Sequence, residues 1–205
     1  MADLGDTGKA PPGVLDLTIR PAPHIVDTLI AERGQKLVNS PHWPLIKPVL
    51  YKILRYREAV RMADQLGPLP GPAAMEYCSR LLSLDLQISG LHNIPRSGAV
   101  IVAANHPTGI ADGVAVYDAL RGVRPDIAIF TNRDAIRINP RLSDFLIPVE
   151  WREDLRDRTK MKETLRLTTR AFNEGRAVVI FPSGRIAFWA EGRLNERPWQ
   201  SSAVT

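Results

Sequence analysis

A histidine and an aspartate follow the longest unbroken apolar run in the sequence. The run covers residues 99–104, and His106 and Asp112 come after it with five residues between them. A histidine that leaves a buried strand can act as a general base near neutral pH. An aspartate beside its other ring nitrogen fixes the tautomer and stabilises the imidazolium. Pro107 and Gly109 favour a loop that brings the pair together; the alternative is that His106 packs at a strand end and Asp112 caps the next helix.

Arginines follow the other apolar runs of the sequence and indicate an anionic ligand. They are Arg133, Arg152 and Arg185. A guanidinium group can bind two oxygens of a phosphate at once, and Gly184 would let the chain before Arg185 approach a ligand closely. The alternative is that each arginine forms a surface ion pair, for which Asp134 and Glu150 are available partners.

The sequence offers no evident nucleophile for covalent catalysis. Ser183 stands in Pro-Ser-Gly-Arg, without the Gly-x-Ser-x-Gly turn of hydrolases, and we interpret it as a turn residue. Cys78 lies in a helix-like stretch and is interpreted as buried packing. The other histidines stand in unrelated segments, with no His-x3-His pair or cysteine cluster, so we expect no metal site.

Short apolar runs without alternation predict strands that are buried on both faces of a sheet. These runs are 99–104, 127–130, 145–149 and 177–181, with a further strand candidate at 86–90. Helix-like stretches lie between them, at 113–120 and at 156–173, where Gly175 is the predicted stop. The alternation predicts an α/β domain with a mostly parallel or mixed sheet covered by helices. In such sheets ligands bind at the carboxyl ends of the strands, where the polar residues above stand.

Three segments divide the chain. Residues 1–44 form an irregular proline-rich arm with one short helix near residues 24–33. Residues 45–84 are predicted to form a helical hairpin, with an amphipathic helix over 45–66, a break at Gly-Pro-Leu-Pro-Gly-Pro and a second helix over 73–84. Residues 85–205 form the α/β domain.

The composition excludes several classes of protein. The 205 residues carry 27 Lys and Arg against 22 Asp and Glu, a net charge of +5 that suits anionic partners. Without a block of like charges, we expect no binding to nucleic acid. The single cysteine excludes an internal disulfide framework and indicates a reducing compartment. The apolar runs are too short to span a membrane and the N-terminus is not a secretory signal, so we expect a cytoplasmic protein.

Two motifs together resemble the glycerolipid acyltransferase family, which includes glycerol-3-phosphate and lysophosphatidic acid acyltransferases. The first motif runs from Asn105 and His106 through Gly109 to Asp112, and the second is Phe-Pro-Ser-Gly-Arg at 181–185. The family carries His-x4-Asp, then a block that ends in an arginine, then Phe-Pro-Glu-Gly-Thr-Arg. The resemblance covers roughly residues 80–205, with Arg152 nearest to the arginine of the middle block. Ser183 and Gly184 belong to the last motif.

This resemblance implies acyl transfer. The donor would be a thioester of coenzyme A or acyl carrier protein, and the acceptor a hydroxyl of glycerol phosphate or a lysophospholipid, with no bound cofactor. His106 would deprotonate that hydroxyl and Asp112 would orient His106, while Arg185 with Arg152 or Arg133 would hold the phosphate. The lipid substrates imply peripheral contact with a membrane, for which the basic, apolar helix over residues 49–66 is the candidate. The alternative is a helix packed on the domain with its arginines in water.

The sequence departs from the family pattern in three places. Five residues rather than four separate His106 from Asp112, and Ser183 replaces the usual glutamate, which shifts the alignment of Arg185 by one position. A fourth motif and a further apolar strand are missing, so we expect a domain that lacks its C-terminal part. These departures leave two alternatives: a catalytically inactive lipid- or acyl-binding protein, and a thioester or phosphoester hydrolase.

Overall fold

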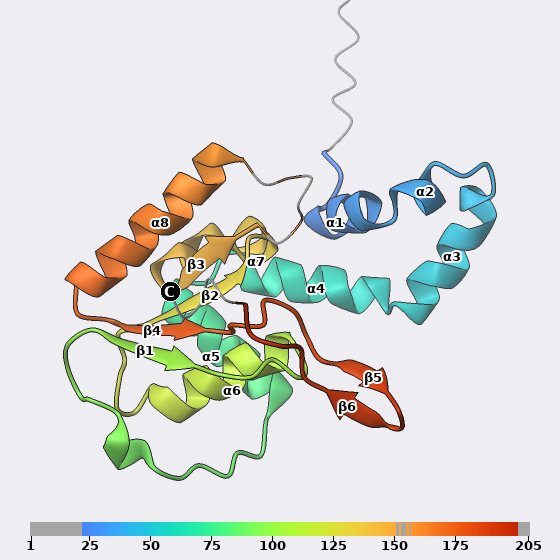
Figure 1. The fold of residues 1–205 in the computed structure, drawn as a ribbon. Coiled ribbons are helices and arrows are strands. Elements are labelled where there is room, and N and C mark those ends of the chain that lie inside the picture. The colour runs from blue at the N-terminus through green and yellow to red at the C-terminus, as the bar shows by residue number, and fades with distance from the viewer. Residues whose placement is uncertain (1–21, 151, 153–154, 156, 201–205) are drawn as a thin grey trace, which may run out of the picture.

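Four parallel strands form the central sheet of the protein in the order β1-β4-β2-β3 (Figure 1). They are β1 Val100–Ala103, β2 Ile127–Asn132, β3 Leu146–Val149 and β4 Ala177–Ile180. The computed structural model describes residues 22–150, 152, 155 and 157–200, so residues 1–21 of the predicted arm lie outside it. Each strand corresponds to one of the four apolar runs, which confirms the predicted α/β class. Because the strands are parallel, their carboxyl ends all lie at the same end of the sheet.

Helices cover both faces of this sheet (Figure 1). The covering helices are α5 Gly71–Leu82, α6 Ile110–Leu120 and α8 Arg158–Asn173. Ile129 and Val179 belong to a core cluster shared with α5 and α6, whereas Ala128 and Val178 belong to a second cluster shared with α8. Residues that neighbour each other in a strand therefore point to opposite cores. This is why the inner strands are apolar throughout rather than alternating.

Strand β1 differs from the prediction because it lies at an edge of the sheet. It pairs with β4 alone in the sheet, and Ile101 is 55% exposed. The expectation that all four runs are buried on both faces is therefore wrong for β1. Strand β3 lies at the opposite edge, but α8 packs against it, and Thr164 of α8 donates a hydrogen bond to the carbonyl of Pro148 at 2.6 Å.

The predicted helices of the α/β part are present, with shifted ends. Helix α8 begins behind Asp157, whose carboxylate accepts a hydrogen bond from the backbone N–H of Lys160, and it ends before Gly175 as predicted. Gly175 has a φ of 70°, which favours glycine at a helix end. Helix α6 begins at Ile110 rather than at residue 113, so Asp112 lies in its first turn.

In residues 22–70, four helices precede α5, and two of them correct the prediction of one helix over residues 45–66. They are α1 Ile25–Arg33, α2 Gln35–Val38, α3 Trp43–Ile53 and α4 Tyr56–Leu66. Helix α1 confirms the short helix expected near residues 24–33. The long helix is broken because Arg55 adopts a left-handed conformation, with a φ of 50°. The chain turns there, and α3 and α4 extend away from the sheet at one side of the molecule (Figure 1).

The corner between α3 and α4 is held by two tyrosines and one carboxylate. Tyr51 and Tyr56 stack with their ring centroids 4.1 Å apart. Their hydroxyls donate to the two carboxylate oxygens of Asp27 in α1, at 2.7 and 2.6 Å. The hydrogen bond to Asp27 raises the pKa of Tyr56 to about 12, so this hydroxyl remains a donor at neutral pH. The cluster fixes α1 against the α3–α4 corner.

Two local predictions fail after α5 and after β4. The strand predicted at 86–90 is absent: Ser83 ends α5 in a left-handed conformation, and the segment that follows pairs with no strand. Conversely, the hairpin of β5 Phe188–Ala190 and β6 Arg193–Asn195 was not predicted. Its turn residues Glu191 and Gly192 both have positive φ, which is the geometry of a tight two-residue hairpin turn. The remaining short elements are α7 Asp134–Ile138 and the 3-10 helices Leu91–Asn93 and Pro140–Asp144.

A buried arginine ties together the amino ends of three strands. Arg124 is fully buried and makes a two-pronged ion pair with Asp126, at 2.8 and 2.7 Å. Its guanidinium also donates to three backbone carbonyls, those of Pro95, Gly98 and Gly175, at 2.8–2.9 Å. These carbonyls belong to the segments that lead into β1 and β4, and Asp126 immediately precedes β2. One side chain thus aligns the starts of the three strands.

We expect Arg124→Met to lower the free energy of unfolding by about 3–5 kcal/mol, because it leaves a carboxylate and three carbonyls without their donor. Urea unfolding followed by circular dichroism measures this. The matched control is Arg170→Met on the exposed side of α8, where the arginine forms an exposed ion pair with Glu174 four residues on and little change is expected. Equal stability of the two variants would show that the buried arginine does not organise the sheet.

Candidate active site

The loop after β1 brings His106 and Asp112 together. His106 stands in the loop, and Asp112 is the third residue of α6. Nδ1 of His106 lies 2.9 Å from Oδ2 of Asp112, and both side chains are mostly buried. The direction of the ring nitrogen does not yet meet hydrogen-bond geometry, and Nδ1 has no other partner among the described residues. In proteins without bound substrate such contacts are often misaligned, and they tighten when the substrate binds.

Asp112 also caps its own helix, so the structure contains both the helix cap and the close approach to His106. Its carboxylate accepts hydrogen bonds from the backbone N–H groups of Thr108 and Gly109, at 2.9 and 2.8 Å. The hydroxyl of Thr108 donates to its other oxygen at 2.6 Å. These three donors hold the carboxylate in place, and its Oδ2 remains next to His106.

Gly109 accommodates the extra residue between His106 and Asp112. Its backbone has a φ of 89° and a ψ of −118°, a conformation that L side chains rarely adopt. A Cβ atom at this position would also lie 3.3 Å from Cγ2 of Ile186. The longer loop is therefore possible because the motif has glycine at the point where the chain turns into α6.

The loop after β4 packs directly on the histidine loop. The rings of His106 and Phe181 stack with centroids 4.5 Å apart, and the N–H of Ala187 donates to the carbonyl of His106 at 3.0 Å. Ser183 is buried, and its hydroxyl donates to the carbonyl of Arg185 at 2.9 Å, inside the turn. The two sequence motifs, residues 105–112 and 181–185, thus form one structural unit, which we call the histidine unit. Arg185 is exposed in this unit, two residues before the contact with His106.

The chain after β6 returns to the same place, which the sequence analysis missed. The indole N–H of Trp199 donates to the side-chain oxygen of Asn105 at 3.4 Å. The N–H of His106 donates to the carboxylate of Glu196, also at 3.4 Å, and the N–H of Gln200 donates to the carbonyl of Pro182 at 2.9 Å. No motif at residues 196–200 signals these contacts, because they depend on the path of the β5–β6 hairpin.

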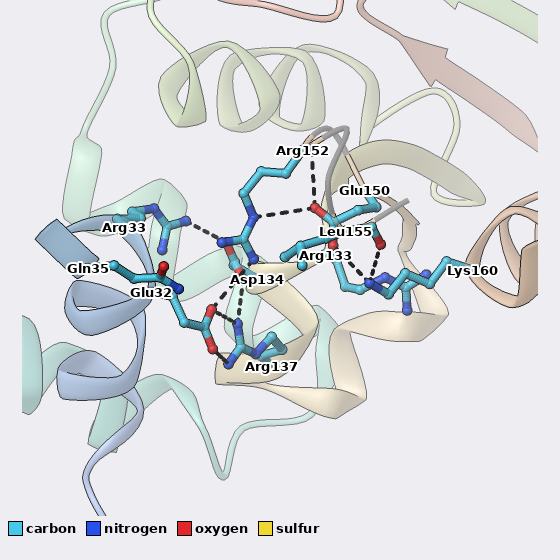
Figure 2. Close-up of a pocket in the computed structure, with 10 residues that line it drawn as sticks. All are labelled: Glu32, Arg33, Gln35, Arg133, Asp134, Arg137, Glu150, Arg152, Leu155 and Lys160. Atoms are coloured by element: carbon cyan, nitrogen blue, oxygen red, sulfur yellow. Dashed lines mark hydrogen bonds and ion pairs between the residues drawn. The ribbon is translucent and has the colours of Figure 1, made fainter. Parts of the chain in front are cut away.

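Arg133 and Arg152 lie together in a cavity of about 670 Å³ at the ends of β2 and β3 (Figure 2). Its lining residues come from α1, α2, α7 and α8 as well as from the strand ends: Glu32, Arg33, Gln35, Arg133, Asp134, Arg137, Glu150, Arg152, Leu155 and Lys160. Arg185 is not among them. The three predicted arginines are therefore divided between the histidine unit and this cavity.

The cavity contains five cationic side chains and three carboxylates, an excess of two positive charges. Arg152 lies 3.7 Å from Glu150, as the ion-pair interpretation expected. Arg133 donates from Nη1 to Glu163 at 2.7 Å rather than to Asp134. Its Nε and Nη2, the other edge of the guanidinium, are buried and have no hydrogen-bond partner among the described residues. An edge of this kind matches the two oxygens of a carboxylate or phosphate.

The histidine unit and the cavity both lie at the carboxyl ends of the strands. Neighbouring strands are about 4.8 Å apart, so the ends of β2 and β3 lie about 10 and 14 Å from the end of β1. A molecule that contacts both places must span roughly this distance, less the reach of an arginine side chain.

Comparisons with known proteins identify the family of the chain. A family model described as acyltransferase matches residues 85–204, which include the histidine unit, three of the cavity arginines (Arg133, Arg137 and Arg152) and the β5–β6 hairpin. The chain belongs to the acyltransferase family. This confirms the resemblance inferred from the two motifs.

Two relatives of this chain are lyso-glycine lipid O-acyltransferases. The chain is 27% identical to the protein from Phocaeicola vulgatus over 133 residues, which cover 64% of this chain and 45% of the relative. It is 22% identical to the protein from Bacteroides thetaiotaomicron over 156 residues, which cover 76% of this chain and 55% of the relative. The chain thus spans about half the length of the curated relatives it matches. No solved structure matches it.

Within the described part of the chain, no three His, Cys, Asp or Glu side chains are grouped so that they could hold a metal ion. In the same residues, no helix has both the length and the apolar character needed to cross a membrane.

The special backbone of Gly109 gives a paired test of the histidine loop. We expect Gly109→Ala to lower the free energy of unfolding by about 1–3 kcal/mol, because alanine is strained at this φ and would crowd Ile186. Gly113→Ala, four residues on and inside α6, should raise it by about 0.5–1 kcal/mol, since an added Cβ meets nothing there and glycine weakens a helix. Chemical unfolding of both variants measures the difference. If the two changed stability in the same direction, the loop would not have this strained conformation.

Proposed function

We propose that this acyltransferase transfers an acyl group from a thioester of coenzyme A or acyl carrier protein to a hydroxyl of a lipid precursor with an anionic head group. Candidate acceptors are glycerol phosphate, a lysophospholipid and, by analogy with the two relatives, a lyso-glycine lipid. The observation that carries the proposal is the contact of 2.9 Å between His106 and Asp112 inside the matched residues.

His106 is proposed as the general base. With Nδ1 next to Asp112, Nε2 is the nitrogen left for the acceptor hydroxyl. Nε2 takes the hydroxyl proton while the oxygen attacks the thioester carbonyl. The tetrahedral intermediate then collapses, the carbon–sulfur bond breaks, and the thiolate receives the proton from the imidazolium. The products are an ester and a free thiol, and Asp112 stabilises the positive charge that His106 carries in between.

The surroundings support direct transfer without an acyl-enzyme intermediate. Ser183 is the serine of the second motif. It is buried, and its hydroxyl donates to the carbonyl of Arg185. It is therefore occupied by its turn. Phe181 stacks on His106 and restricts the rotation of the ring, which favours one position of the base.

The arginines are proposed to bind the anionic head group of the acceptor. Arg185 stands next to the histidine unit, and Arg133 and Arg152 stand in the neighbouring cavity. The unpartnered edge of Arg133 supports this role, because buried guanidinium N–H groups without acceptors are costly unless a ligand satisfies them. The same edge binds a carboxylate or a phosphate, so it suits each of the acceptors proposed.

Replacement of His106 tests the reaction. We expect His106→Ala to lower the acceptor-dependent release of thiol from acyl-coenzyme A by about 10²–10⁴-fold, since this is the usual contribution of a general base. The assay uses a panel of acyl chain lengths, with lysophosphatidic acid or a lyso-glycine lipid as acceptor, and is repeated with acyl carrier protein donors. His92→Ala, which changes an exposed histidine in another segment, serves as the control.

Three outcomes of this assay decide between the alternatives. Full activity of His106→Ala would contradict the general base. Thiol release that needs no acceptor and yields free fatty acid would favour a thioester hydrolase. Binding of acyl donor without thiol release by the wild-type protein would favour a catalytically inactive acyl-binding protein.

Helix α3 is proposed to contact the membrane surface from which the acceptor comes. Leu45, Val49 and Ile53, spaced four residues apart on one side of the helix, are 76%, 60% and 71% exposed. Lys52 borders this apolar stripe. No residue of α3 is buried, and the helix lies at the periphery of the molecule, joined to α4 (Figure 1). Residues 35–61 carry six Lys and Arg against one Glu, which favours an anionic bilayer and a peripheral position on a cytoplasmic membrane face.

Vesicle binding tests this surface. We expect the triple variant Leu45→Ser, Val49→Ser, Ile53→Ser to bind vesicles of phosphatidylglycerol and phosphatidylcholine about 100-fold more weakly, because each side chain contributes about 1 kcal/mol when it enters the interface. Co-sedimentation measures the binding. Met161→Ser with Leu165→Ser on α8, another basic helix with exposed apolar side chains, is the control. Loss of binding in the α8 variant instead would place the membrane contact on α8.

A further inference from the structure

Helix α1 contributes a carboxylate to the arginine cavity, and this carboxylate occupies the best-formed anion site there. The Nη1 and Nη2 atoms of Arg137 both donate to the carboxylate of Glu32, each at 2.7 Å (Figure 2). Nη2 of Arg152 lies 3.6 Å from the same carboxylate. Beside them, Arg33 of α1 pairs with Asp134 of α7. Two arginines of the domain thus converge on one oxygen-bearing group, and that group belongs to the N-terminal helix.

The geometry around Glu32 is that of a bound carboxylate ligand. A two-pronged contact between a guanidinium and a carboxylate has the same donors and spacing as the contact with the carboxylate or phosphate of a lipid head group. The hydrogen bond from Arg137 lowers the pKa of Glu32 below its usual value, so Glu32 is an anion at neutral pH. While Glu32 is in place, Arg137 has no N–H pair left for another anion in this direction.

The ion pairs between α1 and α7 are contacts that a ligand can replace, whereas Asp27 keeps α1 fixed to the α3–α4 corner. No residue of α1 is buried, and its apolar side faces an open apolar groove of about 330 Å³ rather than a closed core. The groove is lined by residues of α1, α4 and α5, among them Val26, Leu29 and Ile30. The ion pairs to α7 are about one third exposed, and pairs of this kind contribute little to stability because water and salt screen them.

We propose that Glu32 is an intramolecular competitor of the acceptor's head group, and that Arg137 is a head-group-binding residue which Glu32 occupies until the acceptor displaces it. The proposal rests on the proposed function, since it assumes that the cavity receives the anionic end of the acceptor. With Glu32 displaced, the cavity has five cationic side chains against two carboxylates. The acceptor anion then meets Arg137 and Arg152 together, next to the unpartnered edge of Arg133. Glu32 thereby sets how strongly an acceptor must bind before it can enter.

Anion binding in the absence of acyl donor tests the competition. The probes are inorganic phosphate and N-acetylglycine, a small carboxylate, measured by isothermal titration calorimetry on the 205-residue chain. We expect Glu32→Gln to bind both probes about fivefold more tightly, the equivalent of about 1 kcal/mol. Glutamine keeps the size of the side chain and removes its charge. Arg137→Gln should bind more weakly than the wild-type protein, and the double variant should lose the gain of Glu32→Gln.

The control is Glu58→Gln, which removes one negative charge from α4, outside the cavity, where Glu58 pairs with Arg55. It should leave both affinities unchanged, and thermal unfolding of all variants verifies that they are folded. A Glu32→Gln protein that binds no more tightly than wild type, or probe binding that does not depend on Arg137, overturns the proposal. So does a gain of equal size in Glu58→Gln, which would show a general charge effect.

This experiment fails separately from the proposed function. If the anion affinities change as expected but no thiol is released from any donor, the competition holds and acyl transfer is wrong. If thiol release depends on acceptor and on His106 while Glu32→Gln has no effect on anion binding, acyl transfer holds and the competition is wrong.

Discussion

A single buried guanidinium determines where the site residues can lie. Arg124 binds Asp126 and the carbonyls of three segments, and in doing so it aligns the starts of β1, β2 and β4. Strands β1 and β4 pair over their whole length, from Val100 and Ala177 to Ala103 and Ile180, and β2 begins at the same level, with Ile127 opposite Ala177. Because the strands are short, a shift of one residue at their starts would move the loops at their far ends by about 3 Å. The distance between His106 and the arginine cavity therefore depends on an interaction at the other end of the strands, where they begin.

The histidine loop shows how a departure from a sequence pattern is absorbed by structure. Five residues between His106 and Asp112 would separate them if the first turn of α6 began later. The helix instead begins at Ile110, and Asp112 caps it while lying beside His106. The helix cap and the contact with His106 use the same carboxylate, so the residue that caps the helix also lies against the proposed base. Its position depends on Gly109, whose backbone conformation excludes most other residues.

The sequence predicts what is local or periodic, and it fails where a contact joins distant segments. The four apolar runs correspond to the four strands, and α8 ends before Gly175 as predicted. Strand burial and helix ends are predictable because each depends on the types of a few neighbouring residues. The break at Arg55 was missed because a left-handed residue other than glycine is sustained by tertiary contacts, here by Tyr51 and Tyr56 on Asp27. Glu32 and Arg137 are 105 positions apart, and neither stands in a motif. Such a pair can be recognised only from the tertiary structure, in which α1 lies beside α7.

Exposed apolar side chains on the segments next to His106 bear on how the proposed acyl transfer would exclude water. Ile110 at the start of α6 is 83% exposed, and Trp189 in the β5–β6 hairpin is 73% exposed. In the proposed reaction, hydrolysis would compete with transfer wherever water reached the thioester carbonyl. Acyl chains of the substrates that packed against these apolar side chains would bury them and reduce the access of water to that carbonyl. The same side chains that are exposed without substrate would then favour transfer over hydrolysis when it is bound.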